Sequence, residues 1–156
     1  MRALVLTALL APACIWAAPP APEPPKAGPY DPTRDSFKDL EAAKALAKAT
    51  GRRILLQVGG NWCPWCHRLH AFFADQQDIT AARDKAFVYV PVNFSKEQRN
   101  EKFLGQFPKV PGYPHFFVLD ADGKLLHSQD TGVLEEDKGY GRGKIAAFIE
   151  AWKPKA

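Results

Sequence analysis

The segment Gly59-Gly60-Asn61-Trp62-Cys63-Pro64-Trp65-Cys66-His67-Arg68-Leu69 decides the fold of this 156-residue chain. It directly follows the apolar run Arg53-Ile54-Leu55-Leu56-Gln57-Val58, which glycines bound on both sides and which therefore predicts a buried strand. Apolar side chains then recur at helical spacing and predict a helix from Cys66 to Gln76. The two cysteines of this segment therefore lie at a strand-to-helix junction.

This position predicts different chemistry for the two thiols. A cysteine at a helix N-terminus faces free backbone N–H groups and the positive end of the helix dipole, and both favour the thiolate. Cys63 is therefore the candidate nucleophile. Cys66 lies one turn further in, where it is more shielded but close enough to attack a mixed disulfide on Cys63. Pro64 fits the first helical turn, where its missing N–H is no loss.

A second segment, Val110-Pro111-Gly112-Tyr113-Pro114-His115-Phe116-Phe117-Val118-Leu119, lies downstream. Together with Trp62-Cys63-Pro64-Trp65-Cys66 it resembles the thioredoxin superfamily, in which a W-C-x-x-C site lies beside a cis-proline that precedes a sheet strand. The resemblance covers residues 37–152 and is closest to bacterial exported thioredoxin-like proteins. It implies an α/β thioredoxin fold, a redox-active Cys63–Cys66 disulfide, and substrate contacts from Trp62, Trp65, Tyr113 and cis-Pro114.

One position departs from the family pattern. Thioredoxins carry a buried aspartate, and the periplasmic disulfide oxidant a glutamate, six residues before the nucleophile, where this chain has Gln57. A glutamine cannot accept a proton, so deprotonation of Cys66 during resolution needs water or another base. The departure bears on the speed of a reductase and leaves the expected fold unchanged.

The N-terminus has the pattern of a secretory signal peptide over residues 1–18. The apolar run of residues 3–10 is too short to span a bilayer, and small residues follow it. Cleavage is expected after the A-x-A match Ala11-Pro12-Ala13 or near Ala17 or Ala18. If the cut falls before Cys14, that cysteine is a candidate lipid anchor; otherwise it is discarded with the signal peptide.

Proline is frequent in residues 19–35, where it forbids a helix and favours extended conformations. We therefore expect a leader or tether there, followed by one domain over residues 36–156. In that domain Ser36-Phe37-Lys38-Asp39 resembles a helix capping box, and Gly51 is expected to end the helix.

The remaining elements follow from hydrophobic periodicity and turn signals. Strands are expected at 86–94, 115–119 and 124–128, with Pro91 marking an edge or an interruption and Asp120-Ala121-Asp122-Gly123 favouring a hairpin. Helices are expected at 79–83, 95–107 and 144–152, and a loop at 132–143. This order suits a single-domain central mixed β-sheet with helices on both faces.

Composition narrows the class of function. The net charge is +4, and basic residues alternate with acidic ones along the chain, so no nucleic-acid surface is expected. Apart from Cys14 only Cys63 and Cys66 are present, which excludes a structural disulfide framework. An export signal with one such pair predicts a periplasmic or secreted protein that does redox work on client proteins, with no cofactor beyond the dithiol.

Three other interpretations of the same residues stay open. Cys63-Pro64-Trp65-Cys66-His67 also satisfies the attachment motif of c-type haem, with His70, His115 or His127 as the second axial ligand. The spacing of Cys63, Cys66, His67 and His70 suits zinc ligands on one helix. The non-enzymatic interpretation is a redox-inert binding module with the thioredoxin fold.

The direction of electron flow is not marked by a known dipeptide between the cysteines. Potentials in the family run from about −270 mV for thioredoxin to about −120 mV for the strong periplasmic oxidant. We expect a reductase, because exported relatives of this kind often keep client cysteines reduced. Such an enzyme needs electrons from a membrane partner, since the space outside the cytoplasm has no thiol buffer of its own.

Overall fold

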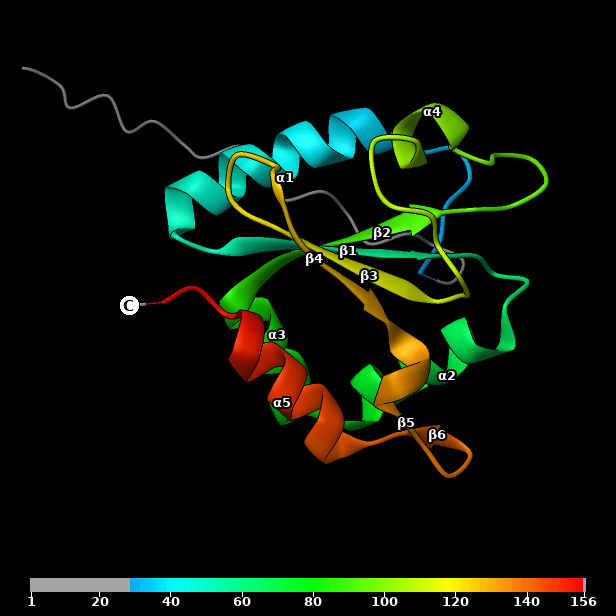
Figure 1. Ribbon diagram of the computed structural model, residues 1–156, viewed down its shortest axis with the longest axis vertical. Coiled ribbons are helices and arrows are strands. Elements are labelled where there is room, and N and C mark those ends of the chain that lie inside the picture. Colours follow the sequence, from blue (N-terminus) through cyan, green and yellow to red (C-terminus); the bar gives the residue numbers. More distant parts are fainter. Residues whose placement is uncertain (1–28, 156) are drawn as a thin grey trace, which may run out of the picture.

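The computed structural model describes residues 29–155 and contains a central four-stranded sheet (Figure 1). The expected signal peptide, Cys14 and most of the proline-rich leader lie outside the described residues. The strand order is β2-β1-β3-β4, and β1 is parallel to β2 but antiparallel to β3, so the sheet is mixed, as predicted. The strands are β1 (Arg53–Gly59), β2 (Phe87–Asn93), β3 (His115–Leu119) and β4 (Leu125–Asp130).

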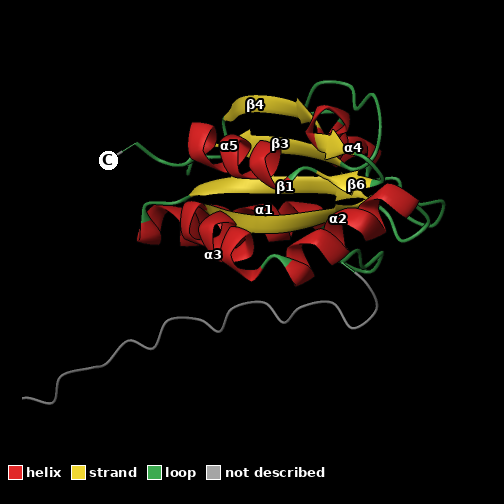
Figure 2. Cartoon of the chain, turned by 90° about the horizontal axis from the view of Figure 1, so that it is seen from below, coloured by secondary structure: helices red, strands yellow, loops and turns green. Residues whose placement is uncertain are grey.

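Helices cover both faces of this sheet, because neighbouring side chains on each strand point to opposite faces (Figure 2). Ile54 and Leu56 of β1 belong to a core with α1 (Ser36–Thr50) and the short α4 (Glu101–Leu104). Leu55 belongs to the other core, which three helices cover. They are α2 (Pro64–Asp75), α3 (Gln77–Ala86) and α5 (Arg142–Trp152). Among the described residues no helix is long and apolar enough to cross a bilayer.

The start of α1 differs from the expected capping box. The N-cap is Asp35, whose carboxylate accepts hydrogen bonds from the backbone N–H groups of Phe37 and Lys38. Asp39, the expected partner in the box, instead accepts a hydrogen bond from the guanidinium of Arg34 at 2.8 Å. The far end is as predicted: Gly51 ends α1 at φ 68°, a left-handed conformation that glycine adopts without steric cost.

The expected helix at 95–107 is reduced to the four residues of α4, which corrects that prediction. Asn100 has φ 52°, and this left-handed residue interrupts any helix that continues through it. The expected loop at 132–143 also contains more structure than predicted. It holds most of the 3-10 helix η1 (Thr131–Leu134) and a small hairpin of β5 (Glu135–Glu136) and β6 (Gly139–Tyr140).

The other elements agree with the sequence. Pro91 lies on β2, which is an edge strand of the sheet, as its missing N–H requires. The turn after Leu119 closes the β3–β4 hairpin through a hydrogen bond from the backbone N–H of Asp120 to the carbonyl of Lys124. The expected helical piece at 79–83 lies within the longer α3.

Part of the segment 29–35, which was expected in the leader or tether, packs against the domain. Tyr30, expected in the tether, is 1 % exposed and forms a small apolar cluster with Cys63 and Cys66. Asn61 holds the same segment, because its side-chain amide donates a hydrogen bond to the carbonyl of Tyr30 at 2.6 Å. Burial of a large side chain contributes about 1.5–3 kcal/mol, which offsets part of the conformational entropy lost when this short segment is held on the domain.

Leu56→Ala is expected to lower the free energy of unfolding by about 2–5 kcal/mol. Leu56 on β1 is fully buried in the core between the sheet and α1, and its truncation leaves a cavity. Leu46→Ala makes the same change on the exposed side of α1 and should alter stability by no more than about 0.5 kcal/mol. Urea unfolding of both variants measures the difference. Equal losses from the two variants would contradict the two-core description.

Candidate active site

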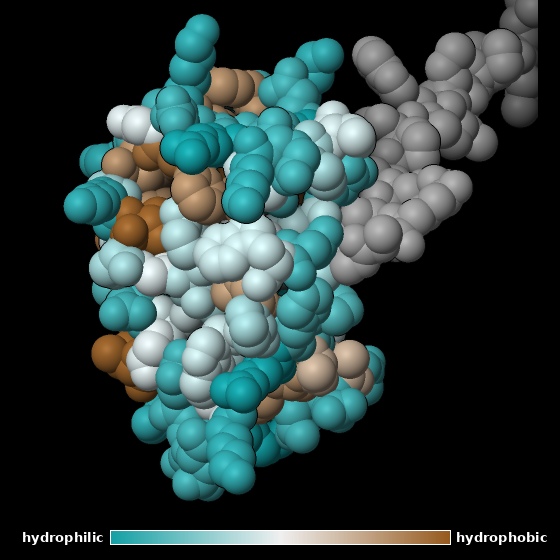
Figure 3. Space-filling view, turned by 90° about the vertical axis from the view of Figure 1, so that its right-hand side faces the viewer, coloured by the Kyte–Doolittle hydropathy of each residue, from teal (hydrophilic) through white to brown (hydrophobic). Residues whose placement is uncertain are grey.

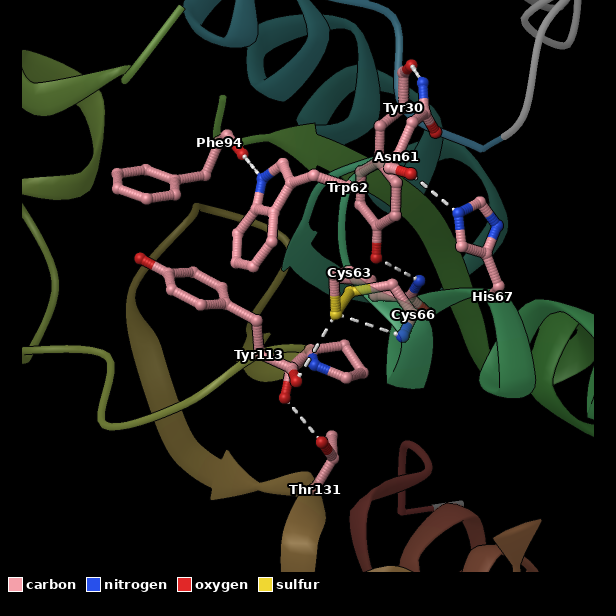
Figure 4. The surroundings of a disulfide bond; sticks show 11 residues. Tyr30, Asn61, Trp62, Cys63, Cys66, His67, Phe94, Tyr113 and Thr131 are labelled. Atoms are coloured by element: carbon pink, nitrogen blue, oxygen red, sulfur yellow. Dashed lines mark hydrogen bonds between the residues drawn. A yellow bond between two sulfur atoms is a disulfide. The ribbon is translucent and has the colours of Figure 1, made fainter. Parts of the chain in front are cut away.

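The two cysteines lie where the end of β1 turns into α2, and they are disulfide-bonded (Figure 4). Cys63 is the N-cap of α2 and Pro64 is its first residue, as predicted. The sulfur of Cys63 accepts a hydrogen bond from the backbone N–H of Cys66 at 3.1 Å. After reduction the same N–H group and the helix dipole favour a thiolate on Cys63, since both stabilise negative charge at this point.

Both cysteines are largely shielded from solvent. Cys63 is 3 % exposed and Cys66 is 1 % exposed, in the order that their positions on α2 predict. The carbonyl oxygen of Tyr113 lies 3.5 Å from the sulfur of Cys63, and the peptide bond between Tyr113 and Pro114 is cis. The structure therefore brings the segment before β3 against the dithiol, as the resemblance implied.

An aromatic wall, formed by Trp62, Phe94 and Tyr113, lies next to Cys63. The indole N–H of Trp62 donates a hydrogen bond to the carbonyl of Phe94 at 2.6 Å. The rings of Phe94 and Tyr113 are stacked at 4.9 Å, and the Trp62 ring meets Tyr113 edge-on at 5.6 Å. Trp62 is 55 % exposed, so part of this wall faces solvent. Figure 3 views the side of the molecule on which the β1–α2 loop lies and shows residues of intermediate hydropathy across its middle.

Trp65 lies apart from this wall. Its ring is half-buried and packs edge-on against Tyr140 at 5.7 Å. The guanidinium of Arg68 covers the ring at 4.4 Å from its centre. Of the four residues expected to contact substrate, Trp62, Tyr113 and Pro114 are thus grouped at Cys63, whereas Trp65 mainly joins α2 to the hairpin of β5 and β6.

Gln57 occupies the position of the family's buried acid and is 1 % exposed. Its side-chain N–H donates a hydrogen bond to the hydroxyl of Tyr30 at 2.6 Å. The amide oxygen of Gln57 has no hydrogen-bond partner among the residues that the structure describes. Burial and, next in size, the phenol of Tyr89 raise the pKa of Tyr30 well above its ordinary value, so this phenol stays protonated.

Sequence reasoning missed two residues of the site, Tyr30 and Phe94. Tyr30 is the only aromatic residue among residues 19–35, and this isolation was the available signal that the leader is anchored at that point. Phe94 was expected as the end of a strand, and only the tertiary structure shows its ring on Tyr113.

The histidines named as alternative ligands have other partners. His67 and His70 are exposed, and a ring nitrogen of His67 lies 2.7 Å from the carbonyl of Asn61. His115 is buried beside Ser128, and burial lowers the pKa of its imidazole, while His127 stacks on Trp152. Within residues 29–155 no three or more His, Cys, Asp and Glu side chains are grouped to hold a metal ion.

Comparison with known proteins places this geometry in context. The family model described as thioredoxin-like matches residues 35–121, more than half of the chain. The thiol:disulfide interchange protein DsbD of Pseudomonas fluorescens is 27 % identical over 122 residues, which are 77 % of this chain but 19 % of that protein. The chain therefore spans about a fifth of the length of this curated relative.

Two solved structures are similar in fold. The disulphide isomerase from Xylella fastidiosa Temecula1 superposes with a TM-score of 0.67 at 27 % identity, over 81 % of this chain and 98 % of that chain. The oxidised C-terminal domain of DsbD from Neisseria meningitidis gives a TM-score of 0.59 at 17 % identity, over 76 % of this chain and 97 % of that chain. This similarity supports the fold alone. With the thioredoxin fold, the cysteine pair at the start of α2 and the family match together, the chain belongs to the thioredoxin-like family.

Proposed function

We propose that this protein is an exported thiol-disulfide oxidoreductase that reduces disulfides in client proteins with its Cys63–Cys66 pair. The observation that carries the proposal is the contact between the sulfur of Cys63 and the backbone N–H of Cys66 at the N-terminus of α2. That contact makes Cys63 the better nucleophile, because the thiolate is the reactive form of cysteine. Two relatives with similar sequences are a thiol:disulfide interchange protein and a disulphide isomerase, which supports the same chemistry here.

The reaction runs in two exchanges. The Cys63 thiolate attacks one sulfur of a client disulfide, a mixed disulfide forms, and the other client sulfur leaves as a thiolate that takes up a proton. The Cys66 thiolate then attacks the sulfur of Cys63, and the second client sulfur leaves in the same way. Two electrons pass from the dithiol to the client, and the enzyme ends in the disulfide form that the structure describes.

The aromatic wall provides the surface for the client. Its rings offer apolar area beside Cys63, and aromatic groups contribute strongly to binding at protein interfaces. Tyr113, at the cis bond to Pro114, offers backbone groups to an extended client segment. A client cysteine with apolar neighbours in an extended chain therefore fits this site best, and Trp65 adds apolar area only where its ring remains exposed.

The oxidised enzyme must be reduced again before the next turnover. Outside the cytoplasm no thiol pool does this, so the electrons come from a membrane partner protein. The expected signal peptide supports a location in the periplasm or outside the cell, and a lipid on Cys14 would hold the chain at the membrane. A disulfide between Cys63 and Cys66 supports this redox function rather than haem attachment or zinc binding by the same residues.

Cys63→Ser is expected to abolish reduction of a disulfide-bonded client, because Cys63 is the N-cap of α2 and the remaining Cys66 is the more buried of the two cysteines. Cys66→Ser should instead accumulate a mixed disulfide between Cys63 and the client, since the resolving thiol is gone. Non-reducing electrophoresis and mass spectrometry measure both results. If the Cys63→Ser protein exchanged disulfides at the normal rate, the mechanism would be wrong.

Trp62→Ala is expected to raise KM for a peptide disulfide with apolar neighbours about tenfold, because it removes the exposed ring of the aromatic wall. The reaction with a small disulfide such as oxidised glutathione should change by less than about threefold, since the thiols stay in place. Phe37→Ala, which removes an exposed ring from α1, is the matched control. An unchanged KM for the peptide would show that clients bind elsewhere.

A further inference from the structure

The side chain of Tyr30 reaches the resolving cysteine from a segment that precedes the family fold. The ring points toward the disulfide in Figure 4 and packs in one cluster with Cys63 and Cys66. It is 1 % exposed, although the residues after it, Asp31 to Asp35, lie mostly near the surface. A buried phenol at this place brings a polar group to the cluster that contains both sulfur atoms.

Gly59 leaves the space in which the phenol and the sulfur meet. A Cβ atom on Gly59 would lie 2.7 Å from the sulfur of Cys66 and closer still to the hydroxyl of Tyr30. Both atoms therefore border the same small volume, at the end of β1. Any residue larger than glycine at this position would separate them.

Gln57 fixes the direction of the hydrogen bonds. Its amide N–H donates to the oxygen of Tyr30 at 2.6 Å, so the phenolic hydrogen is directed elsewhere. The amide oxygen of Gln57, which is buried and without a partner among the described residues, does not compete for that hydrogen in this arrangement. The sulfur of Cys66 borders the same volume and becomes a strong acceptor once it carries a negative charge.

We propose that Tyr30 is a positioning residue for the second exchange, in which its hydroxyl, oriented by Gln57, donates a hydrogen bond to the Cys66 thiolate. The inference rests on the proposed function and concerns only the resolving step. Where thioredoxins have a buried proton acceptor, this site has a hydrogen-bond donor, the Tyr30 hydroxyl. The Cys66 proton passes to solvent, and the phenol stabilises the thiolate that remains. That anion attacks the Cys63 sulfur, the bond from Cys63 to the client breaks, and the client leaves as a thiolate.

The other titratable groups around this site act more weakly or face elsewhere. Tyr89 on β2 and Tyr140 on β6 raise the pKa of the Tyr30 phenol, as burial does first and most, while the Gln57 hydrogen bond lowers it. His67 on α2 is turned toward the carbonyl of Asn61. Tyr30 therefore keeps its proton throughout the range in which thiols titrate, and acts as a donor and never as a base.

The test follows the two exchanges separately in the purified chain. The reduced protein, carrying Cys14→Ser in every variant, is mixed with less than one equivalent of Ellman's reagent, an aromatic disulfide. The first thionitrobenzoate released reports the attack by Cys63, and the second reports the attack by Cys66 on the mixed disulfide. Both rates are measured as a function of pH in the parent, Tyr30→Phe and Tyr89→Phe proteins.

In Tyr30→Phe the midpoint of the pH profile for the rate of the second release should rise by about one pH unit, because the Cys66 thiolate loses a hydrogen bond. At neutral pH this release should be about threefold slower, and well above the midpoint it should be faster, since a more basic thiolate is also more nucleophilic. The two pH profiles therefore cross, which a loss of packing alone would not produce. The rate of the first release should stay within about twofold of the parent's rate in both variants. Tyr89→Phe should leave the pH profile of the second release unchanged.

An unchanged midpoint in folded Tyr30→Phe would overturn the inference while leaving the proposed function intact. If that variant does not fold, Gln57→Met carries the test, because it removes the amide that orients the phenol at similar volume. A midpoint raised in the same direction by a smaller amount supports the inference, and an unchanged midpoint overturns it. If the parent protein gives no second release at all, the proposed function itself fails, and this inference fails with it.

Discussion

The backbone N–H of Cys66 is directed at the sulfur of Cys63, and the rest of the site is arranged around this contact. It exists because β1 ends at Gly59 and α2 begins at Pro64, so the first free N–H groups of the helix face the N-cap residue. The two apolar cores fix the angle at this junction, since β1 is buried between α1 on one side and α2, α3 and α5 on the other. The reactivity of one sulfur thus depends on packing throughout the domain.

Three other segments complete the site around that junction. The segment before β3 brings the Tyr113 carbonyl to Cys63. The residue directly after β2, Phe94, stacks on Tyr113 and accepts the hydrogen bond of Trp62. The N-terminal segment supplies Tyr30 to the side of Cys66. Cys63, the proposed nucleophile, therefore lies beside the exposed aromatic wall, and Cys66, the proposed resolving cysteine, lies beside a buried phenol. This division matches the two exchanges of the proposed function, of which the first needs access to a client and the second needs a stabilised internal thiolate.

The sequence predicted those parts of the molecule whose structure is set by local signals. The apolar run of β1, the proline at the start of α2, and Gly51 at the end of α1 each act within a few residues, and each prediction was confirmed. Trp62-Cys63-Pro64-Trp65-Cys66 and the cis bond at Pro114 also match the expected pattern. The helix expected at 95–107 failed because Asn100 adopts a left-handed conformation, which apolar spacing does not report.

The missed features depend on contacts between distant segments. Tyr30 lies among prolines that favour an extended chain, and the extended conformation does not by itself say that the ring is buried. Its partner Gln57 appeared only as a missing acid, because the hydrogen bond that gives the glutamine a role joins residues 27 positions apart. The capping residue of α1 was misplaced by one position, since Arg34 pairs with Asp39 and leaves Asp35 to cap the helix.

The reduction potential of the Cys63–Cys66 pair tests the central claim most directly. Thiol trapping of the purified protein across a series of dithiothreitol and glutathione redox buffers gives the fraction of dithiol at each potential. The account predicts a two-electron transition near the potential of thioredoxin, about −270 mV, as a reductase of client disulfides requires. A transition near that of the strong periplasmic oxidant, about −120 mV, or a pair that does not titrate at all, would contradict it.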